Sequence, residues 1–274
     1  MKKNIVKKIF IKILKILGYE IIDQNDFTSP TLGKKLNEEL SIINKKSIIL
    51  PLGEVKITKK ISSILVIVRT NTNIGIWDQN KKRLFQLPKI EYSLRSINSL
   101  IKSIKFCNNK YPNIKFKVII VDDKSKEENL FKIKNLINKN SIATSIVSLD
   151  HDKYRVLIKK QDNEQTFSNL ASLLECYNIA KDQGDDLIFF VEDDYIHFEP
   201  MMEEMVASYE RISSQIKKEI FMCPADYPYL YMNNETTNIL IGNKRHWRTV
   251  NQTLCTFMTT KTLLNKYWDN FYNN

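Results

Sequence analysis

The pattern of hydrophobic and polar positions changes character near residue 60. Before it, apolar residues recur at three- and four-residue intervals from Asn4 to Gly18, with lysines on most of the other face and the glycine where a helix would stop. This spacing predicts a basic amphipathic helix whose apolar stripe is Val6, Ile9, Phe10, Ile13, Leu14 and Leu17. A polar, weakly patterned connector follows, so we expect a helix and connector over 1–60 and a separate domain over 61–274.

Strand-like and helix-like segments alternate after residue 60. Continuous apolar runs rich in β-branched or aromatic residues predict strands buried on both faces at 64–68, 117–121 and 187–191. Helical spacing of apolar residues predicts helices at 92–106, 127–138 and 167–181. A weaker strand is expected near 142–149. This alternation predicts an α/β fold with a mostly parallel sheet covered by helices on both faces.

Acidic residues follow two of the predicted strands directly. The pair Asp122–Asp123 follows the second strong strand, and the triplet Glu192–Asp194 follows the third. Ligands of parallel sheets bind at the carboxyl ends of the strands, so both clusters are expected to face one crevice. Three adjacent acids repel one another unless a cation lies among them, and oxygen ligands select Mg²⁺ or Mn²⁺.

These segments resemble a known family. The run from Gly184 to Asp194, followed by Pro200, resembles the strand and D-x-D region of GT-A glycosyltransferases, especially family 2 and its relatives. The run Val-Asp-Asp-Lys-Ser at 121–125 is similar to their V-D-D-x-S, and the order and gaps agree over about residues 61 to 215. The resemblance implies a GT-A fold and metal-dependent, inverting transfer of a sugar from a nucleoside-diphosphate sugar. We expect a UDP-linked donor, and a glycan or lipid-linked acceptor in cell-surface polysaccharide synthesis.

The resemblance, together with the positions of other polar residues, assigns roles along the chain. We expect a Mn²⁺ or Mg²⁺ ion to be held by Glu192, Asp194 and His246. We expect the nucleotide to be held by Arg69, Thr70, Asp122, Asp123, Asp193 and Arg248. We expect Asp226 to take the proton from the acceptor hydroxyl.

The sequence departs from the family pattern at two of these positions. Glu192 stands where the usual first acid of D-x-D is found, so Asp194 is the safer metal ligand. Family 2 members often carry an E-D pair later in the chain, and no such pair follows Asp194. Asp226 is the only Asp between Asp194 and Asp269, so it is assigned by position alone.

Each assignment has a simpler alternative. The pair at 122–123 equally suits the N-cap and first turn of the next helix, and the acidic triplet suits a solvated turn. A lone histidine such as His246 is more often polar surface than a metal ligand, and we expect His151 and His197 to be structural. Four aromatic residues suit either stacking on an acceptor sugar or packing in the core: Tyr227, Tyr229, Tyr231 and Trp247.

The net charge of +11 is unevenly distributed. Residues 1–60 hold thirteen lysines and six acidic residues, so most of the excess lies there. A nucleic-acid-binding module is disfavoured, because the predicted crevice is acidic where a phosphate backbone needs cations. The basic helix instead suits peripheral contact with an anionic membrane through residues 1–18, or packing of its stripe on the following domain.

The remaining sequence features concern location and competing functions. Four cysteines without C-x-x-C spacing favour a reducing, cytoplasmic setting, at the inner face of the membrane if the basic helix binds there. The apolar runs are too short to span a bilayer, and lysines interrupt the first of them without a cleavage site. A sugar nucleotidyltransferase would need a glycine-rich loop after the first strand, and 69–73 contains no glycine. A non-catalytic, nucleotide-binding GT-A domain stays an alternative.

Overall fold

A computed structural model describes residues 2–19, 41–49, 53–74, 85–140, 142–158, 163–232 and 237–273. It contains two compact units, one made of 1–40 with 48–54 and the other of 41–47 with 55–274. The first unit contains helix α1 (Lys2–Ile16), which confirms the predicted amphipathic helix. The predicted domain boundary near residue 60 stays a prediction.

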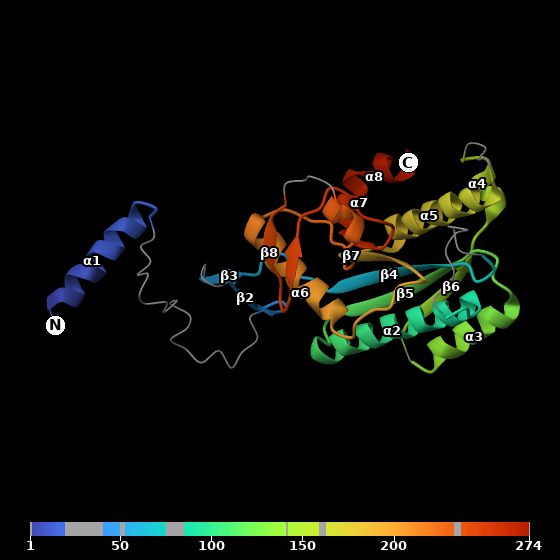
Figure 1. The fold of residues 1–274 in the computed structure, drawn as a ribbon, viewed down its shortest axis with the longest axis horizontal. Helices are drawn as coiled ribbons and strands as arrows, with labels where there is room; N and C mark the ends of the chain where they lie inside the picture. Colours follow the sequence, from blue (N-terminus) through green and yellow to red (C-terminus); the bar gives the residue numbers. More distant parts are fainter. Residues whose placement is uncertain are drawn as a thin grey trace. The chain divides into compact units, whose positions relative to one another are not determined.

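The second unit is built on a five-stranded sheet (Figure 1). Its order is β10-β7-β4-β5-β6, in which β4, β5, β6 and β7 run parallel and β10 is antiparallel to β7. The strands are β4 (Ser63–Thr70), β5 (Lys115–Asp122), β6 (Thr144–Ser148), β7 (Leu187–Glu192) and β10 (Phe257–Thr260). The predicted α/β architecture with a mostly parallel sheet is confirmed.

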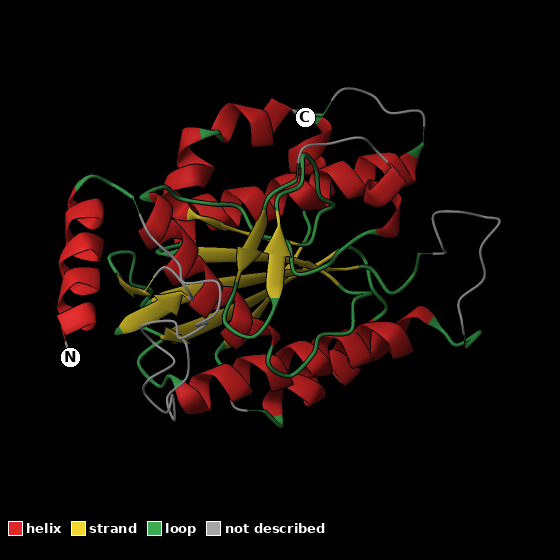
Figure 2. Ribbon diagram, turned by 60° about the vertical axis from the view of Figure 1, so that its left-hand side comes forward, coloured by secondary structure: helices red, strands yellow, loops and turns green. Residues whose placement is uncertain are grey.

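Helices cover both faces of this sheet (Figure 2). Alternate residues of each strand enter different cores: Val66 of β4 packs with one helical layer and Ile67 with the other. The first layer is α2 (Lys89–Lys110), α3 (Glu127–Asn138) and α6 (Met201–Ile216). The second is α5 (Glu164–Gln183), α7 (Lys261–Lys266) and α8 (Trp268–Asn273). Burial on both faces explains why these strands are continuous apolar runs rather than alternating ones.

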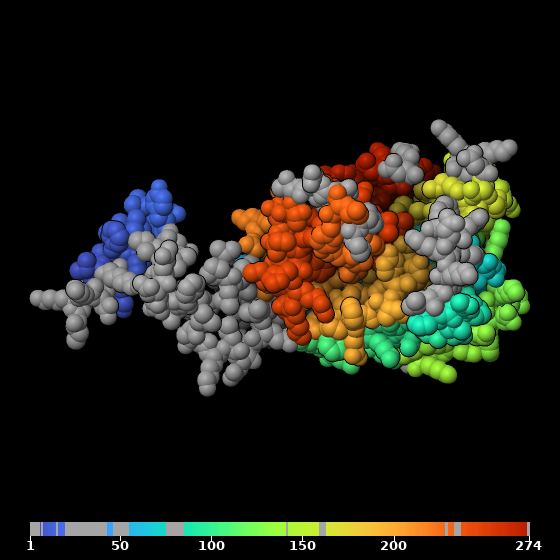
Figure 3. Space-filling model, in the orientation of Figure 1, coloured from blue at the N-terminus to red at the C-terminus, as the bar shows by residue number. Residues whose placement is uncertain are grey.

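Shorter elements complete the chain. Near the amino end lie β1 (Ser41–Ile42), β2 (Lys46–Ile49) and β3 (Gly53–Lys56), of which β1 pairs antiparallel with β2. Helix α4 (His151–Arg155) follows β6. The 3₁₀ turn η1 (Pro228–Met232) precedes an antiparallel hairpin of β8 (Ile239–Ile241) and β9 (His246–Arg248). In the space-filling view the gold surface near residue 200 lies between the green helical layer and the orange C-terminal segments (Figure 3).

Helix α6 anchors this hairpin through buried polar groups. The Glu204 carboxylate accepts hydrogen bonds from the backbone N–H groups of Asn243 and Lys244 and from Nε1 of Trp247. The buried Arg211 donates to the backbone carbonyl of Gly242. A Cβ atom at Gly242 would lie 2.6 Å from the backbone carbonyl oxygen of Arg245, too close for any side chain, so glycine is required at this turn. These donors stabilise the buried Glu204 carboxylate, and their removal would destabilise the turn of the hairpin.

Candidate active site

A pocket of about 150 Å³ opens at the carboxyl ends of β4, β5 and β7. It contains six residues that the sequence assigned to the site: Arg69, Thr70, Asp123, Glu192, Asp193 and Asp194. The other lining residues are Asn71, Ile74, Lys89, Gln165, Ser168, Asn169 and Ser172. The structure therefore brings together the ends of three strands, the start of α2 and one face of α5.

The register of the sheet explains this convergence. Arg69 pairs with Glu192 across β4 and β7, and Thr70 pairs with Asp122 across β4 and β5. The three buried runs thus end at one level, and the first polar residues after them reach solvent together. This is the edge where parallel sheets bind ligands.

Arg69 and Glu192 form an ion pair inside the pocket. Nη2 of Arg69 donates to Oε1 of Glu192 at 2.9 Å, and Nη1 donates to the side chains of Asn169 at 2.8 Å and Ser172 at 3.1 Å. Burial raises the pKa of the Glu192 carboxyl above its ordinary value, while Arg69 opposes that rise. Glu192 is therefore an acid whose charge depends on the neighbouring guanidinium.

Asp193 is saturated by donors from two other elements. Its Oδ1 accepts from Nζ of Lys89 at 2.7 Å, and its Oδ2 accepts from the hydroxyls of Thr70 at 2.7 Å and Ser93 at 2.5 Å. The residue is only 6% exposed. The middle acid of the triplet thus ties β7, β4 and α2 together, and it places the Lys89 ammonium at the pocket wall.

Asp194 is the acid that the site leaves open. It is exposed and lines the pocket, and within the described residues no other residue donates a hydrogen bond to its carboxylate. Its surroundings in the protein raise its pKa by desolvation, Lys89 opposes this, and Asp193 adds to it. A carboxylate that lines the pocket, and to which no other described residue donates, is suited to a cation.

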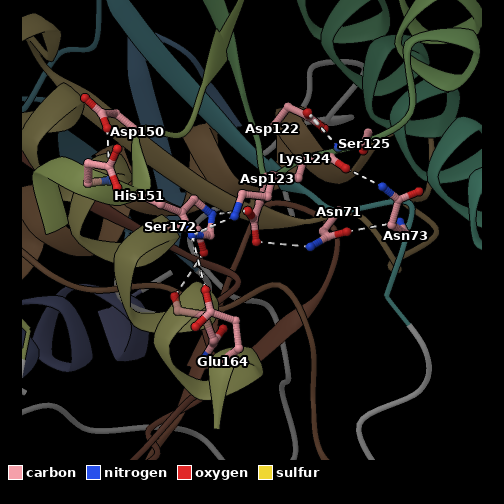
Figure 4. Close-up of polar contacts among 12 residues, drawn as sticks. Asn71, Asn73, Asp122, Asp123, Lys124, Ser125, Asp150, His151, Glu164 and Ser172 are labelled. Atoms are coloured by element: carbon pink, nitrogen blue, oxygen red, sulfur yellow. Dashed lines mark hydrogen bonds and ion pairs between the residues drawn. The ribbon is translucent and has the colours of Figure 1, made fainter. Parts of the chain in front are cut away.

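The pair at 122–123 divides into two environments (Figure 4). Asp122 is buried beneath the pocket, its Oδ2 accepts from the backbone N–H of Ser125, and burial raises its pKa. Asp123 lines the pocket and is hydrogen bonded by Asn71 and His151. The residue that precedes α3 at the N-cap is Lys126, without a side-chain cap. The helix-cap alternative is therefore wrong, although Asp122 does close the turn before the helix.

Asp226 and Arg248 lie together outside the pocket lining. Nη2 of Arg248 donates to Oδ1 of Asp226 at 2.8 Å, and the hydroxyl of Tyr231 donates to Oδ2. The hydrogen bonds from Arg248 lower the pKa of Asp226. The hydroxyls of Tyr195 and Tyr227 lie 2.8 Å apart, so the segment that carries Asp226 borders the segment that follows β7.

His246 is placed apart from the acids of the pocket. It is an exposed residue at the start of β9 and is not among the lining residues. Across the described ranges no group of three or more His, Cys, Asp or Glu side chains is arranged to hold a metal ion. The residues present fit a divalent cation that takes one or two carboxylates, led by Asp194, and completes its shell with phosphate oxygens and water, as Mg²⁺ commonly does.

Some residues of the site carried no signal in the sequence. Lys89 is the first residue of α2, and its contact with Asp193 spans 104 positions. Asn169 and Ser172 lie on α5 among residues whose spacing showed only the apolar stripe. His151 was expected to be structural, and it contacts Asp123. Long-range polar contacts of this kind have no local pattern from which to predict them.

Comparisons with known proteins give similarity of fold. No family model matches the chain, and no curated protein does. Among solved structures, residues 1–349 of S. aureus TarS match with 16% identity and a TM-score of 0.39, over 74% of this chain and 48% of that one. The same TarS fragment in complex with UDP matches with 18% identity and a TM-score of 0.41, also over 74% and 48%. The galactosyltransferase LgtC, in complex with donor and acceptor sugar analogues, matches with 8% identity and a TM-score of 0.29, over 51% and 41%.

These likenesses concern the fold alone. This chain spans less than half the length of each of those structures. The five-stranded, mostly parallel sheet with helices on both faces is the α/β arrangement predicted from the sequence. What the pocket does follows from its own residues.

Proposed function

We propose that this chain transfers a sugar from a nucleoside-diphosphate sugar, with UDP as the nucleotide, to a glycan or lipid-linked acceptor. The observation that carries the proposal is the composition of one pocket. At the ends of three strands it combines a hydrogen-bonded carboxylate, Asp123, two cations, Arg69 and Lys89, and an acid to which no other described residue donates, Asp194. Asp123 would contact the nucleobase, Arg69 and Lys89 would contact the diphosphate, and Asp194 would hold the cation.

The two cations suit the diphosphate of the donor. Arg69 uses Nη1 and Nη2 on neighbouring side chains, and a guanidinium has five N–H donors, so it retains capacity for phosphate oxygens. Lys89 is held at the wall by Asp193 and can donate three hydrogen bonds in all. Both residues would stabilise the negative charge that develops on the leaving nucleoside diphosphate.

A Mn²⁺ or Mg²⁺ ion, when bound, would supply further charge neutralisation at the two phosphates. Asp194 is our proposed ligand for it, and Glu192 supports that role when it is ionised. Asp193 is fully used by Lys89, Thr70 and Ser93, so its part in nucleotide binding is to hold Lys89 in place. His246 is retained only as a proposal for a further ligand.

Asp226 is our proposal for the group that accepts the proton of the acceptor hydroxyl. Asp226 is ionised near neutral pH, as a base must be to accept a proton, and the hydrogen bonds from Arg248 that lower its pKa make it a weak base. Arg248, which the sequence assigned to the pyrophosphate, donates the hydrogen bonds that lower the pKa of Asp226. We propose that the acceptor approaches over the segment joined by Tyr195 and Tyr227, and that the anomeric configuration is inverted.

We also propose that α1 holds the protein at the cytoplasmic face of a membrane. The side chains of Val6, Ile9, Phe10, Ile13 and Leu17 are between 50% and 69% exposed. Six lysines lie in the same segment, which contains no acidic residue. No helix within the described ranges is long and apolar enough to cross a membrane. An exposed apolar stripe flanked by lysines suits an anionic lipid surface, where lipid-linked acceptors would be found.

One observation favours a second candidate, a nucleotide-binding domain without turnover. Glu192 and Asp193 are already paired with cations, which leaves a single open carboxylate in the triplet. A panel of UDP-, GDP-, ADP- and CDP-sugars, with and without Mn²⁺, separates the two candidates. We expect a UDP-sugar with Mn²⁺ to raise the melting temperature and to be turned over in the presence of acceptor. Stabilisation without any turnover or hydrolysis would favour the second candidate, and no stabilisation by any sugar nucleotide would contradict both.

A further inference from the structure

The carboxylate of Asp123 is held by a buried histidine. Nε2 of His151 lies 2.6 Å from Oδ1 of Asp123, and the two residues are 7% and 4% exposed. His151 is the first residue of α4, which follows β6 directly, and Leu149 donates its backbone N–H to the carbonyl of Asp122. The junction after β6 is thereby fixed to the end of β5, with the imidazole hydrogen bonded to Asp123 (Figure 4).

The contact made by the other ring nitrogen, Nδ1, determines which nitrogen of His151 carries the hydrogen. Nδ1 lies 3.3 Å from Nζ of Lys124, an ammonium that can only donate. Nδ1 therefore accepts, Nε2 carries the hydrogen, and that hydrogen is donated to Asp123. Lys124 itself has a φ of 58°, a left-handed backbone conformation that lysine rarely adopts, at the turn that places its side chain beside the imidazole.

The remaining neighbours leave this arrangement intact. Among the residues that the structure describes, Glu164 is the other charged group near Nδ1, at 3.8 Å, and Arg155 engages the same Glu164 oxygen at 2.6 Å. The ring of Phe167 packs against the imidazole at 5.5 Å between centroids. On the far side of Asp123, Nδ2 of Asn71 donates to Oδ2 at 3.0 Å. Both carboxylate oxygens thus have a protein donor, and only acceptor capacity remains toward the pocket.

We propose that His151 is a positioning residue that makes Asp123 a fixed hydrogen-bond acceptor and so selects the base of the donor. This inference rests on the proposed function. A base that presents an imide N–H, as uracil does at N3, is bound by such a carboxylate. Cytosine presents an unprotonated N3 at the same place. Two acceptors would then face each other, and no hydrogen bond would form between Asp123 and the base. His151 is not a lining residue, so it acts through Asp123 alone.

The test compares UDP, CDP and inorganic diphosphate as calorimetric ligands of the full chain with Mn²⁺. His151→Leu removes the donor to Asp123, and His151→Gln restores an N–H at a similar reach. Glu175→Gln is the structural control, because Glu175 holds α4 on α5 through Lys153 and Tyr154 and does not touch Asp123. Melting temperatures are recorded for all variants, so that loss of fold is seen separately.

We expect the wild type to bind UDP at least about tenfold more tightly than CDP. His151→Leu should weaken UDP about tenfold, reduce the preference over CDP, and leave diphosphate binding unchanged. His151→Gln should recover most of the preference, and Glu175→Gln should lower the melting temperature but keep the preference. A wild-type preference in His151→Leu, an equal loss for all three ligands, or a folded His151→Gln without recovery would each overturn the inference. A wild type that binds UDP no better than diphosphate would instead overturn the proposed function.

Discussion

Arg69 and Glu192 face each other across two neighbouring parallel strands, with a guanidinium nitrogen 2.9 Å from the carboxylate. The pair lies where β4 and β7 end, so one residue supplies the cation and the other supplies the acid of the same pocket wall. Neither charge would be stable there alone, because both side chains are largely withdrawn from water. The candidate site is therefore built into the register of the sheet.

Removing Arg69 should weaken donor binding and change its pH dependence. In Arg69→Ala we expect the affinity for UDP to fall at least about tenfold, because a charged donor to the phosphates is lost. Burial already raises the pKa of Glu192, and loss of Arg69 raises it further. As the pH is lowered, a carboxylate with a higher pKa is protonated earlier. Mn²⁺-dependent UDP binding by Arg69→Ala should therefore be lost at a higher pH than binding by the wild type.

Titration calorimetry at several pH values checks both effects. Arg95→Ala is the matched control, since Arg95 is an exposed arginine of α2 paired with Glu91. Wild-type affinity and an unmoved pH profile in Arg69→Ala would contradict the assignment of Arg69.

Removing Asp193 should affect stability more than an exposed acid would. Asp193→Ala leaves the Lys89 ammonium, whose side chain is 11% exposed, without its carboxylate, and deprives Thr70 and Ser93 of their acceptor. Breaking a buried ion pair from one side costs on the order of 3 kcal/mol in the free energy of unfolding. Urea denaturation measures this loss.

The double variant Lys89→Met with Asp193→Leu completes the cycle. It should recover part of the stability lost in Asp193→Ala, because no unpaired charge remains. Equal stability of Asp193→Ala and the wild type would show that the three hydrogen bonds are not formed in solution.

Glu210 should make stability depend on pH. Its carboxylate accepts the backbone N–H groups of Asn44 and Ile61, and burial raises its pKa from 4.5 to about 7. Between these two values the folded state keeps a proton that the unfolded state has lost, so stability falls as pH rises through this range, by about 3 kcal/mol in total.

Urea denaturation of the wild type and Glu210→Gln across that range isolates the effect. The difference in unfolding free energy, variant minus wild type, should rise with pH from about 4.5 to about 7 and then level off. A difference that does not change with pH would mean that Glu210 titrates alike in both states.

Deleting residues 1–18 should remove binding to anionic vesicles and leave transfer to an acceptor in solution largely unchanged. Lysines near an anionic surface contribute about 1 kcal/mol each, so binding should weaken as salt is raised. Co-sedimentation with phosphatidylserine-containing and purely neutral vesicles measures it. Phe10→Glu, within the exposed stripe, should behave like the deletion. If the deletion instead unfolds the protein, and the intact chain does not bind vesicles at low salt, then α1 packs on the following domain.

Much of the fold was predictable because buried strands and helical stripes leave local patterns. The run 64–68 became β4 and the run 187–191 became β7, each within two residues of the predicted ends. The short strand β10 was not predicted, since its four residues carry no alternation and it is defined by pairing with β7. The position of β10 therefore depends on a contact that is distant in the sequence.

The candidate site divides in the same way. Acids directly after buried strands are visible in the sequence, and parallel pairing brings their strand ends together, which is why Asp123 and Asp194 were found. Lys89 and His151 were not recognised, because each reaches its acid across the fold. The roles of His246 and Asp226 stay predictions, as the structure places both outside the pocket lining.

We propose that Asp194 holds a divalent cation that binds a nucleoside diphosphate in this pocket. The most direct measurement is the calorimetric affinity for UDP with and without Mn²⁺ in the wild type, in Asp194→Asn and in Asp185→Asn, an exposed acid before β7 that serves as matched control. We expect Mn²⁺ to strengthen UDP binding at least about tenfold in the wild type and in Asp185→Asn, and to have no effect in a folded Asp194→Asn. Undiminished Mn²⁺ enhancement in Asp194→Asn, or no UDP binding by the wild type with Mn²⁺, would contradict the account.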